Sequence, residues 1–183
     1  IGTPSTEARL KEIGDTGVLA LVCDSTNVFN SEPSGSEGSV YPDLLRHVQD
    51  AKGRVVVTSF ASNAARLQTL ANVARKAGRK LCVAGRSLNR ILSIAQATGY
   101  LKNLPDMVDM NALDQYRRNE VLVIATGGQG EARAALGRIA EGSHPIKLAE
   151  GDTVIFSSKQ IPGNEVAIGK VMNQLAHRNI HMV

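Results

Sequence analysis

A carboxylate and three other hydrogen-bonding side chains follow directly after the first apolar run of the chain. In residues 18–27, VLALVCDSTN, the run ends at Asp24, Ser25, Thr26 and Asn27. An aspartate in this position can cap a helix, hold a turn or bind a metal. No histidine lies close to it in the sequence, so local spacing leaves these three uses open.

Four later apolar runs end in segments of the same chemistry: TSFASN, AGRS, ATGGQGE and FSSKQIPGNE. In open parallel sheets, ligands bind beyond the carboxyl ends of the strands. Hydroxyl groups, backbone N–H groups at helix starts and an arginine are the groups that phosphate oxygens require. Helix capping explains Ser62, Ser87 or Asn164 equally well when each is taken alone. Five such ends together predict a phosphate-binding rim.

The elements that must position this rim are strands and helices in alternation. Continuous runs rich in valine and isoleucine, as in strands covered on both faces, predict strands at 18–23, 54–60, 80–85, 120–126, 152–158 and 180–183. Helical patterns between them are predicted to begin at Ser62 or Asn63, at Ser87, near Gly130 and at Asn164. The alternation predicts an α/β fold with a mostly parallel sheet flanked by helices.

Residues 28–42 are rich in glycine, serine and proline, which predicts a loop or an inter-domain connection. The composition, with 43% apolar and 21% charged residues, is typical of a soluble globular protein. There is no secretion signal and no apolar run of membrane-spanning length, so we expect a cytoplasmic protein with no membrane partner. Cys23 and Cys82 lie in apolar runs and are predicted to be reduced core thiols.

Charge is unevenly distributed along the chain. Residues 1–45 hold two basic and seven acidic side chains, whereas residues 46–90 hold ten basic side chains and one acidic one. Such an excess can attract a polyanion, although solvated helix faces explain it as well. The charge distribution leaves both interpretations open.

Two common nucleotide-binding motifs are absent. Gly128 and Gly130 follow a predicted strand, but Arg133 occupies the third glycine position of the dinucleotide fingerprint, and no phosphate-binding P-loop motif is present.

The histidines do not form a metal motif. His177 and His181 are separated by a predicted helix-to-strand transition, which breaks the shared helical face that a metal-binding pair requires. His47 and His144 are isolated in the sequence and are predicted to lie on the surface or in loops.

Six segments in order along the chain resemble the ribonuclease J branch of the β-CASP metallo-β-lactamase nucleases: GVLALVCDSTN, SGSEGSV, GRVVVTSFASNAARLQ, AGRSLNR, ATGGQGEARAALGRIA and GDTVIFSSKQIPGNE. One departure is Gly128, where the family more often has serine. The resemblance implies that residues 1–42 are the end of a metallo-β-lactamase half-domain with its connection. It also implies that residues 43–183 are a Rossmann-like β-CASP domain.

The resemblance implies a two-zinc nuclease that hydrolyses RNA phosphodiesters, both endonucleolytically and from the 5′ end. Asp24 is then a catalytic residue that bridges the two metals. The remaining ligands, the H-x-H-x-D-H motif and two further histidine motifs, should lie before residue 1 and after residue 183. We therefore expect this chain to be an inactive fragment without bound zinc.

The implied partners are single-stranded RNA, the rest of the metallo-β-lactamase domain and, in the full-length protein, further copies of itself. The residues predicted to bind RNA phosphates are Ser59, Ser62, Asn63, Arg86, Ser87, Thr126, Gly127, Gln129, Gly130, Glu131, Ser157 and Ser158. Two alternatives remain: a free-standing Rossmann-like module that binds a nucleotide or phosphorylated ligand, and a DNA-directed β-CASP nuclease.

Overall fold

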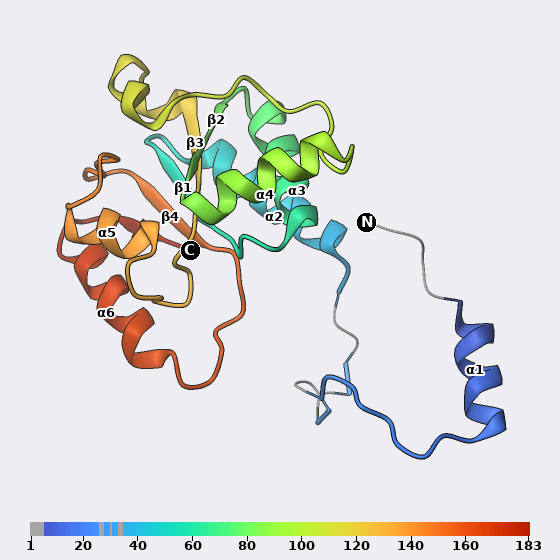
Figure 1. The fold of residues 1–183 in the computed structure, drawn as a ribbon. Helices are drawn as coiled ribbons and strands as arrows, with labels where there is room; N and C mark the ends of the chain where they lie inside the picture. The colour runs from blue at the N-terminus through green and yellow to red at the C-terminus, as the bar shows by residue number, and fades with distance from the viewer. Residues whose placement is uncertain (1–5, 26–27, 30, 33–34) are drawn as a thin grey trace. The chain divides into compact units, whose positions relative to one another are not determined.

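The computed structural model describes residues 6–25, 28–29, 31–32 and 35–183 (Figure 1). By its internal contacts the chain divides into two compact units, residues 1–36 and 37–183. The predicted boundary after residue 42 concerns the domains of a longer protein, and it stays a prediction.

The second unit is built on a five-stranded sheet in which every strand pair is parallel. The strands are β1 (Val55–Thr58), β2 (Lys80–Ala84), β3 (Val121–Ala125), β4 (Thr153–Phe156) and β5 (His181–Met182), in the order β2-β3-β1-β4-β5. All residues of β1 and β3 are buried, as expected of strands covered on both faces. The α/β prediction and the five strands predicted after residue 53 are confirmed.

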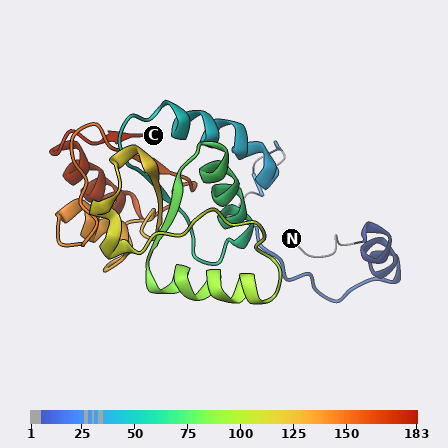
Figure 2. The ribbon, with the colours of Figure 1, turned by 90° about the horizontal axis from the view of Figure 1, so that it is seen from above.

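Helices cover both faces of this sheet (Figures 1 and 2). One face packs against α2 (Tyr41–Asp50), α3 (Ala64–Lys76) and α4 (Arg86–Ala97), and the other against α5 (Ala135–Glu141) and α6 (Glu165–Ala176). Because side chains alternate along a strand, Val55 and Val57 enter the first core and Val56 the second. Three short 3₁₀ helices complete the unit: η1 (Glu37–Val40), η2 (Met110–Gln115) and η3 (Arg118–Glu120).

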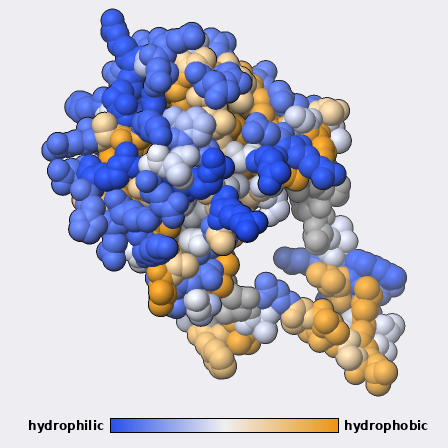
Figure 3. Space-filling view, turned by 60° about the vertical axis from the view of Figure 1, so that its left-hand side comes forward, coloured by the Kyte–Doolittle hydropathy of each residue, from blue (hydrophilic) through white to orange (hydrophobic). Residues whose placement is uncertain are grey.

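The strand predicted at residues 18–23 is wrong. These residues belong to no strand, and Leu19, Leu21 and Val22 are 106%, 80% and 96% exposed. A strand needs the backbone of a neighbour, and within the described residues none pairs with this segment. The first unit also contains α1 (Glu7–Thr16), which was not predicted, and exposed hydrophobic residues gather on this unit (Figure 3).

The prediction that both cysteines are core thiols is half right. Cys82 is buried in β2, and burial raises the pKa of its thiol to about 11. Cys23 is exposed, because the segment that was expected to bury it forms no strand.

The loop predicted at residues 28–42 ends earlier than expected. Residues 37–40 form η1 and α2 begins at Tyr41, with Pro42 in its first turn. Proline is favoured there because the first helical N–H groups need no partner within the helix. The glycine and serine content of this segment favoured a loop prediction, so the start of η1 and α2 was not predicted.

Two of the predicted helix starts differ from the structure. Asn63 caps α3 as predicted, since its side chain accepts a hydrogen bond from the Arg66 backbone N–H (2.9 Å). The cap of α4 is Gly85, so Ser87 lies inside the first turn and is not a cap. The third helix begins at Ala135 rather than near Gly130. In the described part of the chain, no helix has the length and apolar character needed to cross a membrane.

Candidate functional site

The sheet order brings three strand ends together at one edge. β3 lies between β2 and β1, and the helix that follows β3 leaves to the opposite face of the sheet from the helices that follow β1 and β2. α4 follows β2 on one face, and α5 follows β3 on the other. A crevice opens at the carboxyl ends of strands where successive helices diverge in this way, and α/β proteins bind their ligands there.

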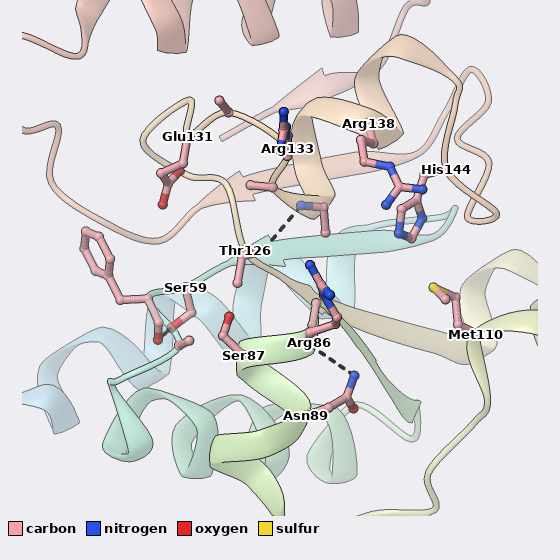
Figure 4. Close-up of a pocket in the computed structure, with 16 residues that line it drawn as sticks. Ser59, Arg86, Ser87, Asn89, Met110, Thr126, Glu131, Arg133, Arg138 and His144 are labelled. Carbon is pink, nitrogen blue, oxygen red and sulfur yellow. Dashed lines mark hydrogen bonds between the residues drawn. The ribbon is translucent and has the colours of Figure 1, made fainter.

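A pocket of about 680 Å³ occupies this position (Figure 4). It brings together five of the predicted phosphate-binding residues, which come from three strand ends: Ser59, Arg86, Ser87, Thr126 and Glu131. Its volume lies within the range of roughly 300–1,000 Å³ that small-molecule sites occupy. Phosphate binding by these five residues stays a prediction, but their proximity to one another follows from the fold.

The β3 end is held against the start of α5. Thr126 accepts a hydrogen bond from the Ala135 N–H through its Oγ1 (3.3 Å) and another from the Leu136 N–H through its carbonyl oxygen (2.9 Å). Gly127 has φ +114°, and a Cβ there would lie 2.9 Å from the Leu136 Cβ. Only glycine fits this turn without displacing α5.

Gln129 joins this loop to the loop that follows β4. Its side chain is 3% exposed and donates to Ser158 Oγ (3.1 Å) and to the Lys159 carbonyl (2.9 Å). Its Oε1 accepts from the Ile161 N–H (2.9 Å) and from the Asn164 amide (3.3 Å). The side-chain amide of Gln129 is therefore hydrogen-bonded within the protein, and it holds the two loops together.

Asn164 stands at the N-cap of α6, as the sequence predicted, but its side chain makes no capping bond. It reaches the Gln129 amide instead, so it links the β3 and β4 ends.

The β4 end adjoins a second cavity, of about 530 Å³. Both predicted residues of this end, Ser157 and Ser158, line it, together with Arg66. Arg66 forms a two-pronged ion pair with Glu37 and donates to the Ser157 carbonyl (2.8 Å). The residues of the predicted rim are thus divided between two cavities. Five predicted residues line neither cavity: Ser62, Asn63, Gly127, Gln129 and Gly130.

Sequence reasoning missed several residues of the larger pocket. Asn89, Arg133, Arg138 and His144 all line it. His144 lies in a loop, as one of the two predicted alternatives had it, but it is 5% exposed and so does not lie on the surface. Arg138 lies three residues after Ala135 and shares its helix face, which is the one sequence signal that could have placed it here. Arg133 and His144 sit in irregular loops, where spacing carries no such signal.

Part of the basic excess in residues 46–90 serves the fold. Arg54 and Arg79 are 1% and 5% exposed. Arg79 donates to three backbone carbonyls and Arg54 to two. Burial lowers the pKa of both guanidinium groups from their usual high value. Neither the polyanion interpretation nor that of solvated helix faces accounts for these two side chains.

Asp24 lies in the first unit and is exposed. Its neighbours Thr26 and Asn27 lie outside the described residues. Across the described ranges, no group of three or more His, Cys, Asp or Glu side chains could hold a metal ion. The described residues therefore do not make a two-zinc site, and the metal-binding role of Asp24 stays a prediction.

The fold and the rim define a parallel α/β domain with a polar, arginine-containing pocket at its strand ends. Residues 52–175 match the family model described as ribonuclease J, beta-CASP domain. The chain belongs to this family, which confirms the resemblance seen in the sequence.

Named relatives match nearly the whole chain. Ribonuclease J of Sinorhizobium meliloti is 40% identical over 100% of this chain and 33% of its own length. Ribonuclease J 1 of Streptococcus pyogenes is 39% identical with the same coverage. Ribonuclease J of Corynebacterium glutamicum is 42% identical over 96% of this chain and 25% of its own length. The chain therefore spans between a quarter and a third of these relatives.

Proposed function

We propose that this chain is the RNA-clamping β-CASP portion of a zinc-dependent ribonuclease that acts in RNA processing and decay. The observation that carries the proposal is the match to ribonuclease J along nearly the whole chain. The longer protein would hydrolyse RNA phosphodiesters both internally and from the 5′ end, in the cytoplasm, as an oligomer.

The chemistry of the strand ends supports an RNA-facing role. Ser59, Ser87 and Thr126 offer hydroxyl groups, and Arg86 offers a planar set of N–H donors suited to phosphate oxygens. Contacts of this kind position a nucleic-acid backbone without reading its sequence. Such a surface suits a nuclease that accepts many RNA sequences.

We assign Asp24 as one metal ligand of the longer protein, whose other ligands come from outside the described residues. A single carboxylate cannot replace the remaining ligands of a zinc site, so the chain by itself should bind no stoichiometric zinc and cleave no RNA. Cleavage by a clean preparation would contradict this expectation. Retained turnover by an Asp24→Ala variant of the longer protein would contradict the assignment of Asp24.

The apolar stretch that ends at Asp24 supports a second part of the proposal, namely that the rest of a metallo-β-lactamase domain is the partner of this segment. Leu19, Leu21 and Val22 are exposed in this chain, although apolar side chains gathered in one segment are normally buried against a neighbouring surface. We propose that the rest of the metallo-β-lactamase domain covers them.

The test is binding of a short fluorescent single-stranded RNA to the 183-residue chain, followed by anisotropy over a series of salt concentrations. Affinity should fall as salt rises, because phosphate contacts release counterions. Arg86→Gln should weaken binding by roughly threefold to tenfold, since an ionic contact to phosphate is lost.

The matched control is Arg90→Gln, one turn further along α4, where the side chain is exposed and lies outside the pocket. It removes the same charge from the same helix and should leave the affinity close to that of the unchanged chain. Binding that ignores salt, or equal losses in both variants, would contradict the proposal. A preference for DNA over RNA of the same sequence would favour a DNA-directed relative instead.

A further inference from the structure

Three arginines of the second unit, Arg86, Arg133 and Arg138, line the 680 Å³ pocket. Seven other arginines of this unit donate to backbone carbonyls or carboxylates: Arg46, Arg54, Arg66, Arg75, Arg79, Arg118 and Arg178. Within the described residues, the guanidinium groups of Arg86, Arg133 and Arg138 make no hydrogen bond or ion pair, although all three line the pocket. Figure 4 shows them on opposite sides of the same hollow.

His144, a largely buried residue, adds a further donor to this set. Its Nδ1 accepts a hydrogen bond from the Ile146 N–H (3.1 Å), so in the neutral ring the proton sits on Nε2. Burial, Arg138 and Lys147 lower the pKa of His144, which favours the neutral ring. Nε2 has no hydrogen-bond partner in the described part of the chain, while the ring lines the pocket. The histidine therefore offers one N–H group to a ligand.

Arg133, which lines the same pocket, is held in an unusual backbone conformation. Its φ is +65°, in the left-handed region that residues with a Cβ rarely adopt. Residues kept in such conformations are concentrated at binding and catalytic sites. Here the conformation belongs to a loop that carries a long cationic side chain into the pocket.

Glu131 is the acidic residue among the described lining residues. Its Oε2 accepts a hydrogen bond from the Gln129 N–H (2.9 Å), so the carboxylate is committed to its own loop. Three guanidinium groups and one neutral imidazole thus face one carboxylate, and the pocket has a net positive charge.

We propose that this pocket binds a polyphosphate group, either that of a nucleoside triphosphate or that of free inorganic polyphosphate. The three arginines line one open pocket rather than a long groove, so they match a ligand whose charges lie on adjacent phosphates. Guanidinium groups bind phosphate oxygens in pairs of parallel hydrogen bonds, which favours arginine for this task. The volume also suits a ligand of nucleotide size.

The experiment is calorimetric titration of the 183-residue chain with tripolyphosphate, ATP, AMP and orthophosphate, without divalent cations. Tripolyphosphate and ATP should each bind one site, at least tenfold more tightly than orthophosphate or AMP. Arg133→Gln and Arg138→Gln should each weaken tripolyphosphate at least fivefold, while Arg90→Gln should change it less than twofold. Tighter binding of ATP than of tripolyphosphate identifies a nucleoside triphosphate as the ligand, and equal binding identifies the polyphosphate group alone.

The proposal is overturned if orthophosphate binds as tightly as tripolyphosphate, or if Arg90→Gln weakens binding as much as the pocket variants do. The same protein samples are tested for RNA binding, which separates the two proposals. Retained RNA binding without tripolyphosphate binding would contradict only the proposed polyphosphate site. Tripolyphosphate binding without RNA binding would contradict only the proposed RNA-clamping function.

Discussion

The arginines of the second unit divide according to what surrounds each guanidinium group. The Arg79 guanidinium donates to the carbonyl groups of Val48, Ala51 and Gly53, and the residue is 5% exposed. Arg133, by contrast, lines a pocket and has no partner among the described residues. The first kind of arginine stabilises the fold by satisfying buried carbonyl groups, and the second is available to a ligand.

His144 should make stability depend on pH. Its pKa is lowered in the folded chain, so as pH falls the unfolded chain takes up a proton first. The stabilisation is present above the ordinary histidine pKa and is lost as pH falls below it. Thermal unfolding between about pH 7.5 and about pH 5.5 should show a falling Tm.

The variant His144→Asn should flatten this dependence, because the Asn side-chain oxygen can still accept from the Ile146 N–H but does not titrate. The control His177→Asn, at an exposed position, should keep the slope of the unchanged chain. Identical slopes for all three proteins would exclude His144 as the source.

At the scale of elements, the loops after β3 and β4 are packed so closely that side-chain size is limited. A Cβ on Gly128 would lie 2.7 Å from Thr58 Oγ1 and 3.1 Å from Ser158 Oγ. A side chain as large as serine at this position would require the ends of β1 and β4 to shift. The loop geometry at this rim is therefore adjusted to glycine.

Gly128→Ala should destabilise the chain by about 1–3 kcal/mol, the usual cost of forcing an extra group into a packed site. Gly137→Ala is the matched control, because a Cβ in the interior of α5 would meet nothing within 4 Å. That change should stabilise the chain by about 0.5–1 kcal/mol, since alanine is the better helix former. Urea unfolding measures both, and equal effects would contradict the packing argument.

At the scale of the whole molecule, both hydrophobic cores lie in the second unit. Every described residue of the first unit is exposed. Glu37, at the start of the second unit, is tied to α3 by its ion pair with Arg66, whose side chain is 13% exposed. The folding unit should therefore begin at Glu37.

Removal of residues 1–36 should leave the Tm unchanged, whereas removal of residues 1–40 should lower stability by about 1–2 kcal/mol. The second truncation leaves the partly buried Arg66 guanidinium without its carboxylate. Thermal and urea unfolding of the two truncated chains would reveal the difference. A large loss of stability on removing residues 1–36 alone would show that the first unit contributes to folding.

The sequence by itself determined the sheet and most of its helices. Apolar runs such as VVV at 55–57 can be buried only in a sheet covered on both faces, and Asn63 caps α3 through a contact local to the chain. The order of motifs along the chain also indicates the family. These features depend on local propensity and on patterns along the chain.

Only the tertiary structure decided which residues meet. Residues 18–23 have a strand pattern but lack a neighbouring strand among the described residues, and a strand exists only through such pairing. Gln129 became a link between two loops because β3 and β4 flank β1 on either side. Arg133 and His144 reach the pocket through irregular backbone, which no periodic pattern encodes. Long-range packing, rather than sequence spacing, assembled the candidate site.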